Sequence, residues 1–311
     1  MSTLALCIPA YNAAAYLPRL LQSAQAQTQA FDEIWVYDDC SRDETAAVAR
    51  SLGAQVVSGE VNRGCSHGKN ILAQRTHCDW IHFHDADDDL TPDFVATAHT
   101  WMQQAEAPDV VLFAYEARDY DSNKRLYERQ FDDAALRQDA IAYSIREQIN
   151  PFCGLYRREA MLRAGGYDTD PQVLYNEDVA FHCRLAIAGL HFAAESRVTV
   201  INYCRANSMS SGNLNKCLQA QYQVMKKVSE QVAPCYWPAI GQRLWAIAAV
   251  SAAQSDWSNA DACVTLAQQL GKPQGLPLGM KQLATYQPGL ALRLREYLIR
   301  GLKPHLRSQR A

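Results

Sequence analysis

Short apolar runs alternate with segments of helical spacing along the first hundred residues, and this alternation constrains the fold more than any other feature. Apolar runs of this length predict buried strands, and apolar residues at every third or fourth position predict helices. The predicted strands cover residues 4–8, 33–37, 55–57 and 80–84. Helices are predicted at residues 14–26, between a cap at Ser41 or Asp43 and residue 52, at residues 69–75, and from Thr91-Pro92 onward. Such repeated strand–helix units predict an α/β fold with a mostly parallel sheet flanked by helices.

The pattern changes beyond residue 105. Strands are predicted at 110–115, 152–156 and 199–203, helices at 158–164 and 177–188, an antiparallel helix pair at 245–254 and 260–270, a Gly- and Pro-rich linker at 271–279 and a basic helix at 290–306. We therefore predict two halves of one α/β domain, residues 1–105 and 106–212. A helical C-terminal region, residues 213–311, would follow them.

Composition places the chain among ordinary globular proteins. It has 311 residues, 48% of them hydrophobic, and a net charge of −3, which gives no reason to expect nucleic acid as a partner. The ten cysteines contain no CxxC pair, which favours reduced thiols in a reducing compartment. No basic and apolar leader and no apolar run of membrane-spanning length is visible, so we expect a cytoplasmic location.

An acidic cluster follows the fourth predicted strand, where ligands of parallel sheets bind. Asp85 and Asp87 are two residues apart at a turn, so both carboxylates can face one hard cation, Mn²⁺ or Mg²⁺. A solvated turn is the plain alternative. A calcium loop is excluded, because Leu90 and Ala96 stand where such a loop needs Gly and an acid. A zinc site of Cys78, His82 and His84 would lack the usual paired CxxC.

Five segments together resemble the inverting family 2 glycosyltransferases, which have the GT-A fold, a Rossmann-like α/β fold. The matching segments, in family order, are Cys7-Ile8-Pro9-Ala10-Tyr11-Asn12, Val36-Tyr37-Asp38-Asp39-Cys40-Ser41, Asn62-Arg63-Gly64-Cys65-Ser66-His67-Gly68-Lys69-Asn70, His84-Asp85-Ala86-Asp87-Asp88 and Asn176-Glu177-Asp178. The fourth is similar to the family's DXD motif. The resemblance extends over residues 1 to 210.

The resemblance implies a site for a nucleotide-diphosphate-sugar, such as a UDP-sugar. Asp87 would be the direct metal ligand, and Asp85 would reach the ribose or a metal-bound water. Asp39 would contact the base. Other residues implied on the donor side are Pro9, Ala10, Tyr11, Asn12, Asp38, Arg63, Lys69, Ala86 and Arg205. The segment around Arg205 lacks the histidine that family members often have there.

The resemblance also implies an acceptor side. Asp178 would be the general base that takes the proton of an acceptor hydroxyl, with Glu177 beside it. Gly154, Tyr167 and Asn176 would border the acceptor. A helix-capping role for Glu177 and Asp178 remains the alternative. The implied reaction is transfer to a glycan or a lipid-linked glycan with inversion, in the assembly of cell-surface polysaccharide or lipopolysaccharide.

Rival functions differ in what they need. A nucleotidyltransferase normally has a Gly-rich first loop, whereas residues 9–15 contain no Gly. A glycoside hydrolase would use two carboxylates without needing Asp38 and Asp39. A non-catalytic sugar-nucleotide-binding protein stays open. Near the C-terminus, Leu290, Leu294, Tyr297 and Leu298 alternate with arginines, which suits a helix lying on an anionic membrane as well as a solvated helix or a dimer contact.

Overall fold

A computed structural model describes residues 2–205, 212–271 and 278–303. The chain forms two compact units, and each is described by itself. The first unit comprises Met1–Ala140, Gln148–Thr169 and Arg184–Ser208, and the second comprises Ile141–Glu147, Asp170–Cys183 and Met209–Ala311.

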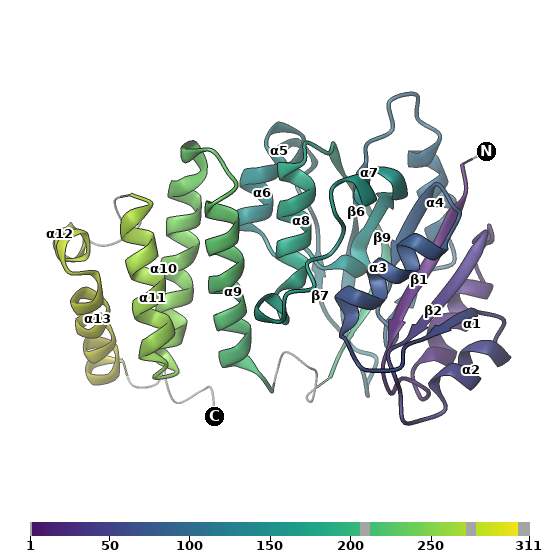
Figure 1. The fold of residues 1–311 in the computed structure, drawn as a ribbon, viewed down its shortest axis with the longest axis horizontal. Coiled ribbons are helices and arrows are strands. Elements are labelled where there is room, and N and C mark those ends of the chain that lie inside the picture. Colours follow the sequence, from purple (N-terminus) through teal and green to yellow (C-terminus); the bar gives the residue numbers. More distant parts are fainter. Residues whose placement is uncertain (1, 206–211, 272–277, 304–311) are drawn as a thin grey trace. The chain divides into compact units, whose positions relative to one another are not determined.

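The first unit is built on a mixed sheet whose parallel part was predicted from the sequence (Figure 1). Its parallel strands are β1 (Leu4–Ala10), β2 (Glu33–Asp38), β3 (Gln55–Ser58) and β4 (Trp80–Phe83), connected by α1 (Leu17–Gln25), α2 (Thr45–Ser51) and α3 (Cys65–Arg75). The sheet order is β3-β2-β1-β4-β8-β6-β9-β5. The expected α/β fold with a sheet flanked by helices is confirmed.

The remaining strands make the sheet less parallel than predicted. They are β5 (Asp89–Leu90), β6 (Val110–Asp119), β7 (Arg125–Arg129), β8 (Gly154–Arg157) and β9 (Phe192–Cys204). β8 is antiparallel to β4 and β6, β7 is antiparallel to β6, and β5 is antiparallel to β9, whereas β6 and β9 are parallel. The shorter elements α5 (Asp133–Gln138), η1 (Pro151–Cys153) and α7 (Arg158–Arg163) lie between them.

The predicted boundaries of β1 and α3 were wrong. β1 does not end at Pro9 but continues to Ala10. It pairs with β4 only as far as Cys7, so at Pro9 it has a neighbour on one side alone, where a missing N–H is tolerated. α3 begins at Cys65 rather than at Lys69, because Gly64, at φ 84°, turns the chain into the helix.

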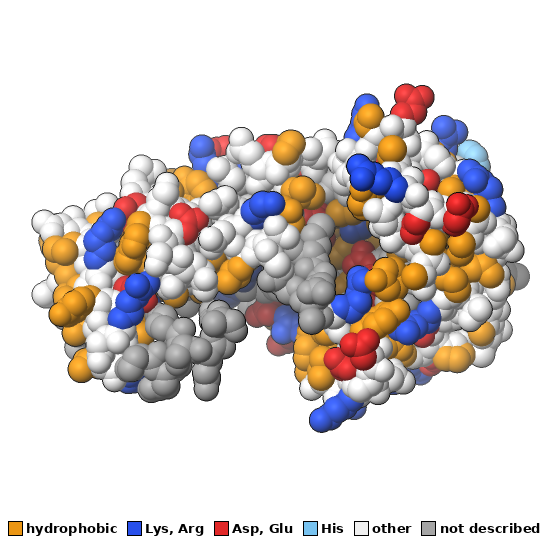
Figure 2. Space-filling view, turned by 90° about the horizontal axis from the view of Figure 1, so that it is seen from below, with side chains coloured by type: hydrophobic (Ala, Val, Ile, Leu, Met, Phe, Trp, Pro, Cys, Tyr) orange, Lys and Arg blue, Asp and Glu red, His pale blue; other side chains and the backbone are white. Residues whose placement is uncertain are grey.

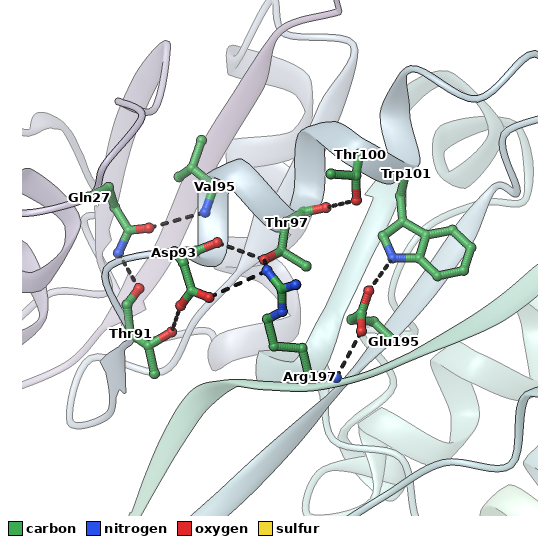
Figure 3. A network of polar contacts seen from close by, with 9 residues as sticks. All are labelled: Gln27, Thr91, Asp93, Val95, Thr97, Thr100, Trp101, Glu195 and Arg197. Atoms are coloured by element: carbon green, nitrogen blue, oxygen red, sulfur yellow. Dashed lines mark hydrogen bonds and ion pairs between the residues drawn. The ribbon is translucent and has the colours of Figure 1, made fainter.

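α4 (Phe94–Met102) begins two residues later than Thr91-Pro92 suggests, with Asp93 as its N-cap. The Thr91 hydroxyl donates to the Asp93 carboxylate at 2.6 Å instead of capping the helix itself (Figure 3). Gln27 bridges this turn, since its amide donates to the Thr91 carbonyl and accepts from the Val95 N–H. Arg197 of β9 donates to the Thr97 hydroxyl, so the helix that follows the acidic cluster is fixed at both sides.

The second unit is helical apart from its connections. Its elements are α6 (Ala140–Arg146), η2 (Pro171–Val173), α8 (Glu177–Ile187), α9 (Leu214–Ser229), η3 (Pro234–Tyr236), α10 (Trp237–Ala253), α11 (Trp257–Gln269), α12 (Leu278–Tyr286) and α13 (Pro288–Leu302), with α6 and α8 crossing the boundary between units. α9, α10 and α11 run alongside one another (Figure 1). Asn259 donates to Ser251 at 2.9 Å in the buried seam between α10 and α11, which confirms the predicted helix pair. The predicted linker falls mainly on residues 272–277 and the end of the predicted basic helix on 304–306, outside the described residues.

None of the helices in the described residues combines the length and apolarity needed to cross a bilayer.

Candidate functional site

The carboxyl ends of β1 and β2 bring the first two predicted segments together. Ala10 pairs with Asp38, and the Asp39 N–H donates to the Ala10 carbonyl at 2.9 Å. Asn12 fixes the turn after β1. Its N–H donates to the Ser41 hydroxyl, and its side-chain oxygen accepts from the Arg42 N–H. Tyr11, which follows β1, is 47% exposed, and its contact with a nucleotide stays a prediction.

Asp39 is buried and already holds the loop that leads into α3. Its two carboxylate oxygens accept from the N–H groups of Arg63 and Gly64 at 2.8 and 2.7 Å. A carboxylate oxygen can accept more than one hydrogen bond, so Asp39 can still accept a further hydrogen bond from a ligand. The structure therefore brings Arg63 to the same rim, through its backbone. Asp38, also buried, accepts from the Ser41 N–H.

The acidic cluster divides into side chains with different environments. Asp88 is 1% exposed and accepts from the Asn202 side chain at 2.9 Å and from the Tyr203 N–H at 2.8 Å. Burial, with the nearby charges of Asp87 and Asp85, raises the pKa of Asp88 well above its usual range. Asp88 is thus a buried anchor for the end of β9, and Asp85 and Asp87, both half-buried, remain as candidate ligands.

Asp87 forms an ion pair with Arg205, which follows β9. The Arg205 guanidinium lies 4.3 Å from the centre of the Tyr16 ring and 5.7 Å from that of Tyr120. Burial acts against the charge of Arg205, but Asp87 and Tyr16 outweigh it and raise the Arg205 pKa above its ordinary value. A positive group is therefore held beside the carboxylate that the DXD resemblance assigns to a metal.

Tyr16 and Tyr120 were missed by the sequence analysis, together with Arg19, whose guanidinium lies 4.6 Å from the Tyr120 ring centre. Arg19 also lies 4.3 Å from the centre of the Tyr203 ring, so the two arginines stand among three tyrosines. Residue 16 is more than a hundred positions from residues 120 and 203, and no local pattern links them. Only the assembled sheet brings them together.

The donor set fits a divalent cation. Asp85 and Asp87 offer hard oxygens, the ligand type of Mn²⁺ and Mg²⁺, which complete their shells with water and phosphate. Asp87 already faces a positive group. Among the described residues there is no group of three or more His, Cys, Asp or Glu side chains suited to a metal.

The histidines of the zinc alternative are used elsewhere. His82 Nδ1 bonds the Gly154 carbonyl at 2.8 Å, and its Nε2 bonds His84 Nδ1 at 2.9 Å. Burial lowers the pKa of His82 to about 4, which keeps the ring neutral. Both ring nitrogens of His82 are therefore engaged, and Nδ1 links β4 to β8.

Lys69 and Tyr167 lie together beneath the rim. Lys69 is 1% exposed, and its ammonium lies 5.0 Å from the centre of the Tyr167 ring, which is itself 2% exposed. Asn70 holds Tyr167 by both backbone groups, accepting from its N–H at 2.8 Å and donating to its carbonyl at 3.0 Å. The contacts of Lys69 with a donor and of Tyr167 with an acceptor stay predictions.

Gly154 opens β8 against a neighbour that excludes any side chain. A Cβ at this position would lie 2.0 Å from the hydroxyl of Tyr156. Packing against Tyr156 thus requires glycine at position 154. A contact of Gly154 with an acceptor stays a prediction.

Asn176, Glu177 and Asp178 belong to the second unit, at the start of α8. Asn176 and Glu177 are buried, Asp178 is half-buried, and the Asp178 carbonyl bonds His182 Nδ1 at 2.7 Å. Tyr175, at φ 77°, turns the chain just before them. Their catalytic and acceptor roles stay predictions.

Comparison with known proteins gives partial sequence relatives. The chain is 33% identical over 91 residues to a protein of Haemophilus influenzae described as an uncharacterized glycosyltransferase, covering 29% of this chain and 31% of that protein. It is 33% identical over 89 residues to the succinoglycan biosynthesis protein ExoO of Rhizobium meliloti, covering 28% and 26%. The chain thus spans about a third and about a quarter of these relatives.

Similar solved structures cover nearly the whole chain. TarS residues 1–349 of S. aureus, crystallised with UDP-GlcNAc, has a TM-score of 0.74 at 17% identity, covering 96% of this chain and 92% of that one. The mannosyltransferase PcManGT of Pyrobaculum calidifontis, in complex with GDP-Man and Mn²⁺, has a TM-score of 0.59 at 17% identity, covering 97% and 81%. At this identity the likeness concerns the fold, and it supports the expected GT-A type.

The sequence profile described as Glycosyl transferase family 2 matches residues 5–163. This match takes in β1 to β4, the Asp38-Asp39 rim and the acidic turn, and it extends over slightly more than half of the 311 residues. The chain belongs to glycosyl transferase family 2.

Proposed function

We propose that this protein transfers a sugar from a nucleotide-diphosphate-sugar, in the first instance a UDP-sugar, to an acceptor hydroxyl with inversion. The observation that carries the proposal is the acidic turn after β4, in which Asp87 faces Arg205 at the same sheet edge as Asp38 and Asp39. Family membership supports it, as do two proteins of similar fold whose structures contain UDP-GlcNAc and GDP-Man.

On the donor side, Asp87 and Asp85 would hold Mn²⁺ or Mg²⁺, which when bound neutralises the charge that develops on the leaving diphosphate. Arg205 is proposed to contact the diphosphate, for which a guanidinium is a suitable charged donor. Asp39 is proposed to accept from the base, and its two backbone hydrogen bonds would fix the carboxylate for that contact. The remaining rim residues, Pro9, Ala10, Tyr11, Asn12 and Ala86, are proposed to line the nucleotide.

On the acceptor side, Asp178 is proposed as the general base, with Glu177 beside it. Asp178 would take the proton of the acceptor hydroxyl while that oxygen bonds to the anomeric carbon and the bond to the diphosphate oxygen breaks, which inverts the carbon. Gly154, Tyr167 and Asn176 would border the acceptor. An Asp178→Asn variant should bind donor normally and lose transfer, whereas transfer at the parent rate would remove this assignment.

The proposed setting is the assembly of cell-surface polysaccharide or lipopolysaccharide in the cytoplasm, on a glycan or lipid-linked glycan. We also propose the predicted division, with residues 1–105 binding donor, 106–212 binding acceptor and 213–311 forming a separate helical region. A non-catalytic sugar-nucleotide-binding protein and a nucleotidyltransferase are the alternatives that an assay must separate.

Thermal-shift measurements with UDP, UDP-GlcNAc and GDP-Man, each with Mn²⁺ and with EDTA, test the donor site, because a ligand of the folded state raises the melting temperature. We expect a nucleotide-dependent rise that requires Mn²⁺ and is lost in Asp87→Asn. Glu106→Gln, which removes an exposed acid outside the acidic turn, is the matched control. A rise of equal size in Asp87→Asn would contradict the metal assignment. Donor binding without transfer or hydrolysis would favour the non-catalytic alternative.

A further inference from the structure

Large hydrophobic side chains are exposed mainly at the end of the described chain. Six of the eleven exposed ones lie in or beside the last two helices: Tyr286, Leu290, Leu294, Tyr297, Leu298 and Leu302. Tyr286, Tyr297 and Leu302 are more than 70% exposed. Hydrophobic and basic side chains lie side by side at the end of Figure 2 where α12 and α13 are drawn. Exposed apolar residues gathered in this way usually mark a contact surface.

α13 has apolar side chains on two faces, and only one of these faces packs against the rest of the unit. Ala291 and Leu292 are 1% exposed, and the helix packs on α10 and α11. Leu290, Leu294 and Tyr297 follow one another at intervals of four and three, so they share the side turned away from that packing. We call these three residues, with Leu298 and Leu302, the outer face of α13. Each of these side chains is between 42% and 77% exposed.

Basic residues outnumber acidic ones around the outer face. In residues 278–303, the described end of the chain, five basic residues stand against a single acid, Glu296, although the net charge of the whole chain is −3. Glu296 is 1% exposed and accepts from Arg300 at 2.8 Å. The same guanidinium donates to the Ala252 carbonyl and the Ser255 hydroxyl at the end of α10, and about half of the Arg300 side chain remains exposed. Lys303, just after α13, is exposed as well.

Arg293 is fixed beside the outer face. It donates to both carboxylate oxygens of Asp261 at 2.7 and 2.8 Å and lies 4.9 Å from the centre of the Trp257 ring. Asp261 offsets part of its charge. The positive character of the surface thus rests mainly on Lys303, which is exposed, and on the accessible parts of Arg295 and Arg300.

We propose that the outer face of α13 binds the surface of an anionic lipid bilayer. Leucine and tyrosine side chains would enter the boundary between head groups and acyl chains, and the neighbouring basic groups would contact lipid phosphates. Charge decides between this partner and a second copy of the chain, because two copies meeting through this face would bring like charges together. The proposal does not depend on the proposed transferase function.

Flotation of the full chain with vesicles tests the proposal. Vesicles of phosphatidylglycerol and phosphatidylcholine should bind the parent, with at least tenfold less binding to pure phosphatidylcholine or in 0.5 M salt, since salt screens the phosphate contacts. The double variant Leu290→Gln, Leu294→Gln should lose at least tenfold in binding. The matched control is Leu126→Gln, Leu214→Gln, because these leucines are 50% and 40% exposed against 50% and 42% for the tested pair.

All four replaced side chains are at least 40% exposed, so both variants should keep the melting temperature of the parent. Equal vesicle binding by the two double variants would overturn the proposal, as would failure of the parent to bind or equal binding to neutral vesicles. A parent dimer that the tested pair converts to a monomer, without any vesicle binding, would assign the face to a second copy. Nucleotide-dependent melting, unchanged in both variants, reports separately on the proposed donor site.

Discussion

Asn70 joins α3 to the loop before Tyr167, and its replacement should weaken the first unit measurably. The amide accepts from the Tyr167 N–H at 2.8 Å and donates to the Tyr167 carbonyl at 3.0 Å, next to a residue that is 2% exposed. Each such hydrogen bond contributes about 1 kcal/mol net, and an unsatisfied buried partner costs about 1–3 kcal/mol. Asn70→Ala should therefore lower the free energy of unfolding by about 2–4 kcal/mol.

Asn70→Asp provides a sharper comparison, because it keeps an acceptor for the N–H but sets a carboxylate oxygen against the Tyr167 carbonyl. It should be no more stable than Asn70→Ala. Urea unfolding followed by tryptophan fluorescence measures both, since Trp80 is buried in the same unit. Gln104→Ala, the loss of an exposed amide, is the control. A change below about 0.5 kcal/mol for Asn70→Ala, the size typical of an ordinary surface substitution, would refute the reasoning.

Three further predictions concern packing and charge. Gly68→Ala would place a Cβ 2.6 Å from the Tyr37 ring, and the overpacking should exceed the gain in helix propensity, giving a net loss of about 1–2 kcal/mol in urea unfolding. Gly241→Ala, in α10 with its nearest neighbour at 3.8 Å, should instead stabilise by about 0.5–1 kcal/mol in the same measurement. The hydrogen bond from Lys227 lowers the pKa of Asp170 below its ordinary value of 3.8. The stability that this pair contributes is therefore present above pH 3.8 and is lost as the pH falls through the lowered pKa. The melting temperature of the parent, measured from about pH 6 to about 2.5, should include this loss, and that of Asp170→Asn should lack it.

The sequence predicted the parallel half of the sheet because its strands are buried on both faces and are read as continuous apolar runs. β7 escaped prediction because residues 125–129 mix charged side chains with exposed apolar ones, as an edge strand does. β9 was predicted at less than half its length, since its first part carries polar residues that bond outside the strand, such as Glu195 with Trp101.

The candidate site divides in the same way. Asp38, Asp39, Asp85 and Asp87 were predicted because each follows a strand, and strand ends of a parallel sheet share one edge. The sequence did not indicate which acid of the turn is buried, because Asp88 differs from its neighbours only through contacts with residues 202 and 203. The tyrosines around Arg205 depend equally on long-range pairing.

The anchoring of Asp88 has a consequence for shortened versions of the protein. The family profile ends at residue 163, yet the donors that satisfy Asp88 come from Asn202 and the N–H of Tyr203. β5, the strand directly after the acidic turn, likewise pairs with β9 and nothing nearer. A fragment cut at the profile boundary would retain all the acids of the turn and lose what holds them in place, so it should not be used to judge whether this protein binds a metal.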